Sequence, residues 1–287
     1  MIAIIKKEMR NYFNHITGYV FLFFYTVLSA IFFIMTNVLQ LSAEYFHTLI
    51  NSTIIFMLMI PMLTMRLFSE EFSQKTDQLL YTAPITTSSI VLGKFFAACL
   101  MLLIGLAITF IFPYLISPYG QLPLNRIIGT YIGFYLMGCA FISIGILVSV
   151  STHSQIVAAI GSFAMIFTFF MMGPLILAIP ATREAGIIFA SIVSIALGYI
   201  FYSSTKSAWA SGGFLAALLS ALGILYVVSP GFYDGLAIRS LQWVSLVSRF
   251  QSFSLGILDV ADVIYYITFS ILFCFFAITV IEKRRWA

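Results

Sequence analysis

Residues 127–182 read IIGTYIGFYLMGCAFISIGILVSVSTHSQIVAAIGSFAMIFTFFMMGPLILAIPAT, and these 56 residues contain no Asp, Glu, Lys or Arg. A membrane-spanning helix needs about 20 mostly apolar residues, so a stretch of this length must fold back once. The polar group STHSQ at 151–155 is where we expect the turn. The stretch therefore predicts two membrane-spanning helices, near residues 127–149 and 156–178.

The composition of the whole chain favours the same fold class. Of its 287 residues, 62% are hydrophobic and only 8% are charged, whereas a soluble domain carries about 25% charged residues. An ordinary soluble enzyme is therefore excluded, and so is a disordered chain, which needs low hydrophobicity and high charge. We expect an all-α polytopic membrane protein that forms a single transmembrane domain over residues 1–287.

Charge-free windows in the rest of the chain add six candidate spans to these two. The pair within 187–228 is also compatible with a re-entrant hairpin, which would leave six spans in total. We expect eight, because a hairpin would place Lys206 at depth in the bilayer, where an unpaired charge is costly. The eight predicted helices lie near 17–39, 47–65, 94–116, 127–149, 156–178, 187–204, 208–228 and 263–281.

The distribution of Lys and Arg between loops predicts the orientation. With the N-terminus inside, the inside segments hold ten of these residues and the outside segments hold four. Positively charged loops are retained in the cytoplasm, and Asp and Glu are divided evenly between the two sides. Both termini are therefore expected to be cytoplasmic, which requires an even number of spans. Segment 229–262 is then external.

Several functions find no support in the residues. There is no G-x-x-x-x-G-K-[ST] phosphate loop, and the net charge of +4 is too scattered for a nucleic-acid surface. No charged residue lies in the middle of a confident span, which suggests that the energy for transport comes from another chain. The cysteines lie far apart in apolar stretches, so we expect small buried side chains and no metal site at Cys99, Cys139 and Cys274.

Residues 2–16 predict an amphipathic helix at the cytoplasmic membrane surface. At about 100° per residue, Lys6, Lys7 and Arg10 fall opposite an apolar face. Such a helix lies in the interface with its basic side chains toward anionic lipid. A basic flank that only sets the topology is the alternative. The apolar face consists of Ile2, Ile5, Met9, Tyr12, Phe13 and Ile16.

Segment 66–93 is the largest predicted cytoplasmic piece and contains a second amphipathic helix. Phe68 and Phe72 begin its apolar side. Glu71 and Lys75 are four residues apart in the order that favours an ion pair. A helix of this kind suits docking into a groove of a partner, where apolar anchors enter and a charged rim sets the register. A helix lying flat on the membrane is the alternative.

A third amphipathic stretch, 236–253, is predicted on the outer side. Leu236, Trp243, Val247 and Phe250 form one stripe, which places Trp243 at headgroup depth. A plain capping helix is equally compatible with this pattern. Further basic residues that flank spans are expected at the membrane interface, namely Arg249, Arg284 and Arg285.

Small residues at four-residue spacing predict close packing of two helices. Gly129 and Gly133 open the fourth span, and Gly212, Ala216 and Ser220 follow one face of the seventh. Such spacing lets helix backbones approach closely. Each set forms either a groove for another helix of the same chain or a dimer face.

The segment that begins RLFSEE at 66–71 resembles a known family. With Thr76, LL at 79–80, TAPI at 82–85 and GK at 93–94, it is similar to the ABC-2-type permeases of ATP-driven ABC transporters, nearest to the branch named for gliding-motility permeases. Other blocks agree with this resemblance: SQIVAA at 154–159, SLVSRFQSF at 245–253, the spaced residues Gly256, Ile257, Asp259, Asp262, Tyr265 and Tyr266, and EKRRW at 282–286.

The resemblance implies a permease subunit of a bacterial plasma membrane that binds no cofactor itself. In the family, two such subunits pair with two cytoplasmic ATPase subunits, which bind ATP and Mg. The part matching 66–82 is the coupling helix on the ATPase, with a connecting helix beside it at 2–16. Residues 180–230 depart from the six-span family pattern. The expected coupling residues are Arg66, Phe68, Glu70, Glu71, Phe72, Lys75, Thr76, Asp77, Leu79 and Leu80.

The sequence therefore predicts the transmembrane permease subunit of an ATP-driven exporter, coupled to a separate ATPase and paired with a second permease subunit as a homodimer or heterodimer. The alternative is a stand-alone polytopic membrane enzyme or lipid scramblase with polar groups gathered at one interface. Its candidate residues are Arg249, Asp259 and Asp262. The apolar interior suits a lipid-like, peptide or hydrophobic drug-like cargo.

Overall fold

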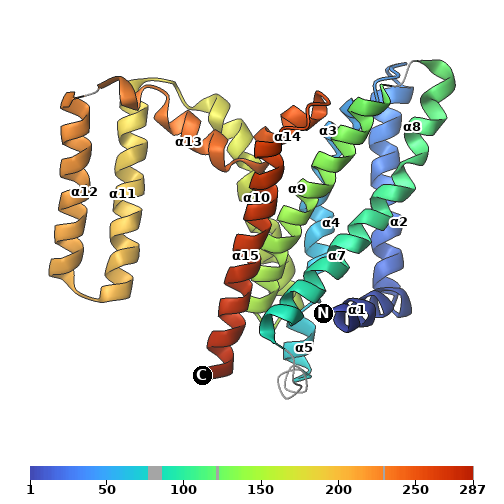
Figure 1. The fold of residues 1–287 in the computed structure, drawn as a ribbon, viewed down its shortest axis with the longest axis horizontal. Helices are drawn as coiled ribbons and strands as arrows, with labels where there is room; N and C mark the ends of the chain where they lie inside the picture. The colour runs from blue at the N-terminus through green and yellow to red at the C-terminus, as the bar shows by residue number, and fades with distance from the viewer. Residues whose placement is uncertain (77–85, 121–122, 229, 287) are drawn as a thin grey trace. The chain divides into compact units, whose positions relative to one another are not determined.

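A computed structural model describes residues 1–76, 86–120, 123–228 and 230–286 (Figure 1). These residues are almost entirely helical and contain no strand, as the sequence predicted. The helices are α1 (Ile2–Asn14), α2 (Ile16–Phe33), α3 (Phe46–Ser52), α4 (Ile55–Thr64), α5 (Ser69–Ser73), α7 (Thr87–Thr109), α8 (Ile111–Ile116), α9 (Leu124–Ser151), α10 (Gln155–Ala178), α11 (Arg183–Thr205), α12 (Ala208–Val228), α13 (Leu236–Val244), α14 (Leu246–Ser254) and α15 (Val260–Trp286). A π-helix, η1 (Ile34–Val38), continues α2, and η2 (Ser117–Tyr119) and η3 (Pro230–Tyr233) are 3-10 turns.

The number of candidate membrane spans agrees with the prediction. Within the described residues, seven helices are long and apolar enough to cross a membrane, and a bent pair supplies an eighth if it counts as one span. That pair, Phe46–Ser52 and Ile55–Ser73, meets at 59° within the region where the sequence predicted one helix near 47–65. The hydroxyls of Ser52 and Thr53 bond to carbonyls one turn back, at 2.9 and 2.8 Å. Such bonds compete with the helical ladder and favour a bend.

The chain divides into two compact units, and the first comprises Met1–Thr168 with Arg249–Ala287. Its central helix is α9. In the 18-residue window that qualifies α9 as a candidate span, 72% of the residues are buried. Helix α9 packs against α15, α7, α4 and α3. Figure 1 shows that α1, α5 and the last turns of α15 lie at the same end of this unit. Cys99, Cys139 and Cys274 are buried free cysteines of unit 1, as predicted.

Groups of the same chain pack against the small residues of α9. A Cβ atom at Gly133 would overlap the ring of Phe253, and one at Gly129 would lie 3.5 Å from the Cα of Gly256. The hydroxyl of Thr130 donates to the carbonyl of Phe253 at 3.2 Å. Of the two predicted uses of Gly129 and Gly133, the structure therefore shows the groove within one chain.

The second unit is Phe169–Ser248, and its main feature is the hairpin of α11 and α12. Each helix alone is long and apolar enough to cross a membrane. Lys206 makes the turn with φ at +52°, a left-handed conformation that ends α11. The predicted stripe on α12 is solvent-accessible in this unit: a Cβ at Gly212 would meet nothing within 4 Å among the described residues, and Ala216 and Ser220 are exposed.

The predicted amphipathic helix 236–253 is two helices, α13 and α14. Ser245 separates them with an extended backbone, ψ at 115°. Its hydroxyl accepts the amide of Ser248 at 3.2 Å, which caps the start of α14. The predicted single stripe is therefore broken: Trp243 is 67% exposed, whereas Phe250 is only 2% exposed.

Candidate functional site

The predicted coupling helix, 66–82, contains α5, which spans only Ser69–Ser73. Residues 77–82 of that prediction lie outside the described residues. Gln74–Thr76 form a turn, in which Lys75 has φ at +58°. Because this left-handed conformation takes Lys75 out of the helix, the predicted ion pair of Glu71 with Lys75 is wrong. Three other predicted coupling residues lie outside the described residues: Asp77, Leu79 and Leu80.

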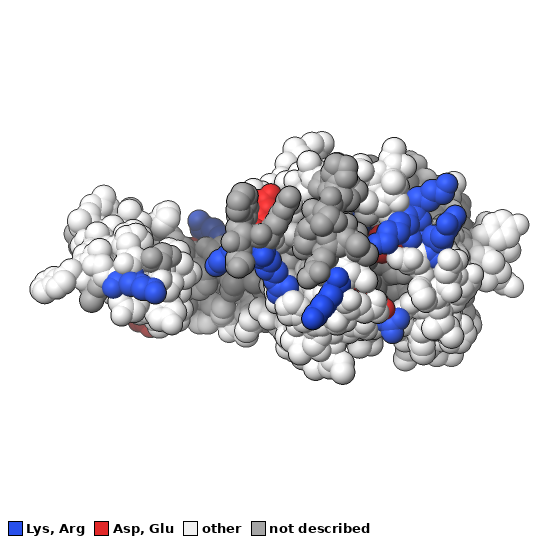
Figure 2. Space-filling view, turned by 90° about the horizontal axis from the view of Figure 1, so that it is seen from below, with Lys and Arg blue, Asp and Glu red and all other residues white. Residues whose placement is uncertain are grey.

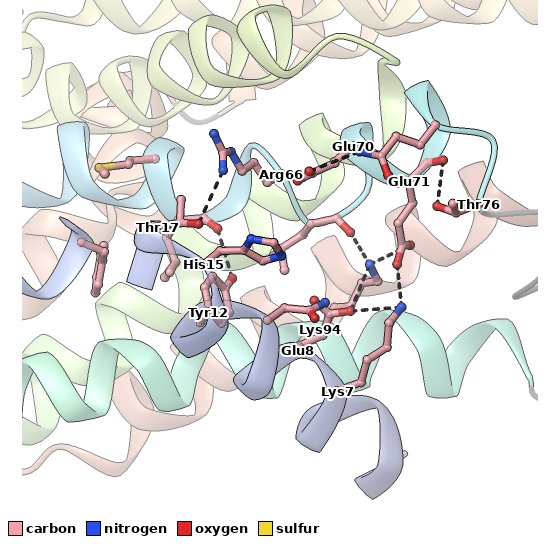
Figure 3. A pocket seen from close by; sticks show the side chains of 16 residues that line it. Lys7, Glu8, Tyr12, His15, Thr17, Arg66, Glu70, Glu71, Thr76 and Lys94 are labelled. Carbon is pink, nitrogen blue, oxygen red and sulfur yellow. Dashed lines mark hydrogen bonds and ion pairs between the residues drawn. The ribbon is translucent and has the colours of Figure 1, made fainter. Parts of the chain in front are cut away.

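Glu71 instead belongs to four charged side chains that we call the α5 charge cluster: Lys7, Glu8, Glu71 and Lys94. Lys94 Nζ lies 2.7 Å from Glu71 Oε2 and 3.5 Å from Glu8 Oε1. Lys7 Nζ lies 3.0 Å from Glu71 Oε1 and 3.8 Å from Glu8 Oε1. Figure 3 shows these side chains converging from α1, α5 and α7. Two positive and two negative charges balance.

The centre of the α5 charge cluster is deeply buried. The side chain of Lys94 is 1% exposed, and those of Glu8 and Glu71 are 8% and 16% exposed. A lone charge at this depth would be strongly unfavourable, so each member depends on its neighbours. Lys94 also donates to the carbonyl of Leu67 and lies 4.6 Å from the ring centre of Phe68.

Lys7 is the half-exposed member of this cluster. Burial by itself would lower the pKa of its ammonium, but the carboxylate of Glu71, helped by that of Glu8, outweighs the burial. The net effect raises the pKa of Lys7 above its ordinary value, so the ammonium stays charged at neutral pH.

Helix α1 has a buried face that the sequence did not predict. Ile4, Glu8 and Tyr12 recur every four residues and are buried, and the Tyr12 hydroxyl donates to the carbonyl of Leu63 at 3.1 Å. Tyr12 was predicted on the membrane face, so that assignment is corrected. Gly93 of α7 permits the contact, because a Cβ there would lie 2.8 Å from Ile4 Cγ2.

The other two faces of α1 agree with an interfacial helix. The basic face, with Lys6, Lys7 and Arg10, is exposed, and on the apolar face Ile2 is 79% exposed. Ile16, which was predicted on that face, begins α2 and is 76% exposed. Figure 2 shows Lys and Arg side chains on the face of unit 1 at the end where α1 and α5 lie.

The start of α5 is held by a side chain from α9. The Ser149 hydroxyl, which is fully buried, accepts the backbone amides of Phe68 and Ser69 at 3.2 and 3.3 Å. These amides begin the helix and have no partner within it. Close packing accompanies this contact, because a Cβ at Gly145 of α9 would overlap Thr64.

The apolar side of α5 faces into the chain. Phe68 and Phe72 are 2% and 6% exposed. The guanidinium of Arg284, on α15, lies 4.8 Å from the ring centre of Phe72 and donates to the carbonyl of Ser151 at 2.9 Å. Phe68 and Phe72 are therefore not available as anchors for a partner, and Arg284 is held by protein groups instead of projecting only toward lipid. The side chain of Arg285 lies outside the described part.

A cavity of about 380 Å³ lies beside the charge cluster. Figure 3 shows Arg66 and Glu70 among the side chains that line it. Arg66 donates to the hydroxyl of Thr17 at 3.5 Å, and Gln74 donates to Glu70 Oε1 at 3.5 Å. The lining also includes Asn11, Tyr12, His15 and Thr76, and its apolar residues are Phe21, Met62, Leu63 and Leu67.

Charged residues near the other end of unit 1 have structural partners. Arg249 Nη1 lies 2.8 Å from Asp262 Oδ1, and its guanidinium carbon lies 4.1 Å from the ring centre of Tyr265. Asp259 Oδ1 accepts the amide of Ala261 at 2.9 Å, at the start of α15. Arg249 was predicted at the membrane interface, but its side chain is only 18% exposed. Ion pairing and helix capping account for the residues that the membrane-enzyme alternative would use.

Sequence reasoning missed Glu8, Lys94 and Ser149. Glu8 gave one signal, since it occupies the four-residue repeat between Ile4 and Tyr12. The sequence placed Lys94 at the start of a span near 94–116, but helix α7 begins seven residues earlier, at Thr87. Nothing in the sequence pairs either residue with Glu71.

Comparison with known proteins gives one family match. A model described as "ABC-2 family transporter protein" matches residues 2–190, which include α1, α5 and every member of the α5 charge cluster. A search of curated proteins finds no match.

Proposed function

Because this chain belongs to the ABC-2 family of transporter proteins, we propose that it is the transmembrane permease subunit of an ATP-driven exporter. In this proposal a separate cytoplasmic ATPase binds ATP and Mg and drives the transport. The permease supplies the path through the membrane and the contact through which it is driven.

The connections of α5 carry this proposal. Glu71 joins it to α1 and α7 through Lys7 and Lys94, Ser149 joins it to α9, and Arg284 joins it to α15. A displacement of α5 would therefore act on four helices at once. Packed helices of this kind move as rigid elements with small shifts at their contacts.

The surface offered to the ATPase differs from the one predicted from sequence. Phe68 and Phe72 hold α5 in the bundle, whereas residues 73–76 are exposed at its end. We propose that Lys75 and Thr76 contact the ATPase together with the sequence-predicted residues that follow, Asp77, Leu79 and Leu80.

The orientation and assembly are further parts of the proposal. The positive-inside pattern puts both termini in the cytoplasm, and the common position of α1 and the last turns of α15 at one end of unit 1 supports this. A second permease subunit, identical or homologous, would complete the path, and the membrane would be the bacterial plasma membrane.

The proposal is tested with the chain co-expressed with its cognate ATPase. Replacing both Leu79→Asp and Leu80→Asp should leave membrane insertion intact and abolish co-purification and stimulation of ATP hydrolysis, because charged side chains would enter the proposed contact. Ile257→Asp and Leu258→Asp, in the exposed loop before α15 and outside any candidate span, are the matched pair that should retain the ATPase. Unchanged co-purification and stimulation by the Leu79/Leu80 variant would contradict the proposal.

A further inference from the structure

The cavity beside α5 contains two opposite charges that are not used by the α5 charge cluster. Arg66 has a weak hydrogen bond to Thr17, and Glu70 has one to Gln74. In the part of the chain that the structure describes, neither residue forms an ion pair. The remaining cavity charges, Lys7, Glu8, Glu71 and Lys94, neutralise one another. The cavity therefore offers one free positive and one free negative group.

The depth of this cavity is fixed by the helices that line it. Thr17 is the second residue of the candidate span Ile16–Val38, and Arg66 lies two residues after the end of α4 at Thr64, so both lie close to the ends of apolar helices. This is where a bilayer presents its headgroups. The lining combines polar side chains with apolar ones, which include Phe21 and Met62. A ligand with a charged head and an apolar continuation matches both parts.

We propose that this cavity binds the headgroup of an aminophospholipid, with the phosphate on Arg66 and the primary ammonium on Glu70. The phosphate oxygens accept hydrogen bonds from the guanidinium of Arg66 and the hydroxyl of Thr17. The ammonium donates to the carboxylate of Glu70.

Other headgroups fit these side chains less well. A choline headgroup has no N–H to donate to Glu70, and quaternary ammonium sites are built from aromatic faces. The hydroxyl of Tyr12 is bonded to Leu63 and the ring of Phe21 is 1% exposed, so the cavity offers no such cage. An anionic glycerol headgroup would leave Glu70 without a cationic partner. The expected order of affinity is therefore ethanolamine, then choline, then glycerol.

The inference rests on the membrane location of the chain and not on its coupling to an ATPase. It is tested on the purified permease alone, so its failure is distinguishable from failure of the proposed function. Palmitoyl-oleoyl phosphatidylethanolamine, phosphatidylcholine and phosphatidylglycerol are added in equal amounts to protein in detergent, and bound lipid is measured by native mass spectrometry. Soluble phosphoethanolamine is titrated separately.

The wild-type protein should retain the ethanolamine lipid about tenfold more than the glycerol lipid, as expected for one charge-assisted hydrogen bond. Glu70→Gln should remove this preference, and Arg66→Gln should weaken retention of all three lipids. Lys206→Gln, at the exposed hairpin turn of unit 2 and outside the cavity, should behave as wild type.

Equal retention of the three lipids by the wild type would overturn the proposal. So would Arg66→Gln and Glu70→Gln proteins that elute as folded material on gel filtration and match Lys206→Gln in lipid binding. Saturation by soluble phosphoethanolamine at the concentration that suffices for the lipid would overturn the assignment to a membrane lipid.

Discussion

Helices α9 and α12 have similar sequence patterns but lie in different surroundings. Both are apolar, and both carry small residues at four-residue spacing. In unit 1, 72% of the span window of α9 is buried, and its Gly133 and Gly145 face Phe253 and Thr64. In unit 2, 6% of the span window of α12 is buried, and Gly212 faces nothing within 4 Å among the described residues.

This difference teaches that one sequence signal has two outcomes. Small residues permit close approach of helices, but they do not supply the helix that approaches. In α9 the facing groups come from the same chain. In α12 no group of the described residues faces Gly212 within 4 Å.

The largest expected effect concerns the buried charges of unit 1. Lys94→Met should lower the free energy of unfolding by about 3–5 kcal/mol, because Glu8 and Glu71 lose their buried partner. The matched change in unit 2 is Lys206→Met, at the exposed hairpin turn, with an expected effect within about 0.5 kcal/mol. Thermal unfolding in detergent measures both.

A second variant separates lost charge balance from lost packing. Combining Lys94→Met with Glu71→Leu leaves Lys7 and Glu8 as a balanced pair and should restore much of the lost stability. If Lys94→Met unfolds at the same temperature as Lys206→Met, the two units do not differ as described.

The next effect concerns the glycines. Gly133→Leu should destabilise the protein by about 1–3 kcal/mol, because the new side chain would overlap the ring of Phe253. Gly212→Leu should change stability by at most about 1 kcal/mol, in the stabilising direction, because leucine favours the helix more than glycine does. The same thermal measurement compares them, and equal losses in the two variants would remove the distinction between α9 and α12.

Much of the fold was predictable because the bilayer restricts the choices. Residues 127–182 gave two helices with a turn at the predicted place, since long charge-free runs have few other solutions. The bend near Thr53 and the break at Ser245 were missed. Both depend on single hydroxyls that bond to backbone groups, and apolar periodicity does not reveal such bonds.

The candidate site was predictable in location but not in detail. The pattern around Glu70 and Glu71 pointed to the segment that contains α5, whereas Lys94 lies 23 residues farther along the chain and Glu8 lies 63 residues before Glu71. Such partners are set by how α1 crosses α7, which depends on Gly93 and Ile4 in contact. The inward turn of Phe72 was missed because amphipathicity shows that a face is apolar, not what covers it.

The central claim is that the end of unit 1 carrying α5 faces the cytoplasm and meets the ATPase. The direct measurement is labelling of Gln74→Cys and Ile257→Cys with a membrane-impermeant maleimide, in a background without the three buried cysteines. Both positions are exposed, and the account assigns them to opposite sides. We expect Ile257→Cys to react on intact cells, and Gln74→Cys to react only after permeabilisation and to be protected by the bound ATPase. Reaction of Gln74→Cys on intact cells, or no protection, would contradict the account.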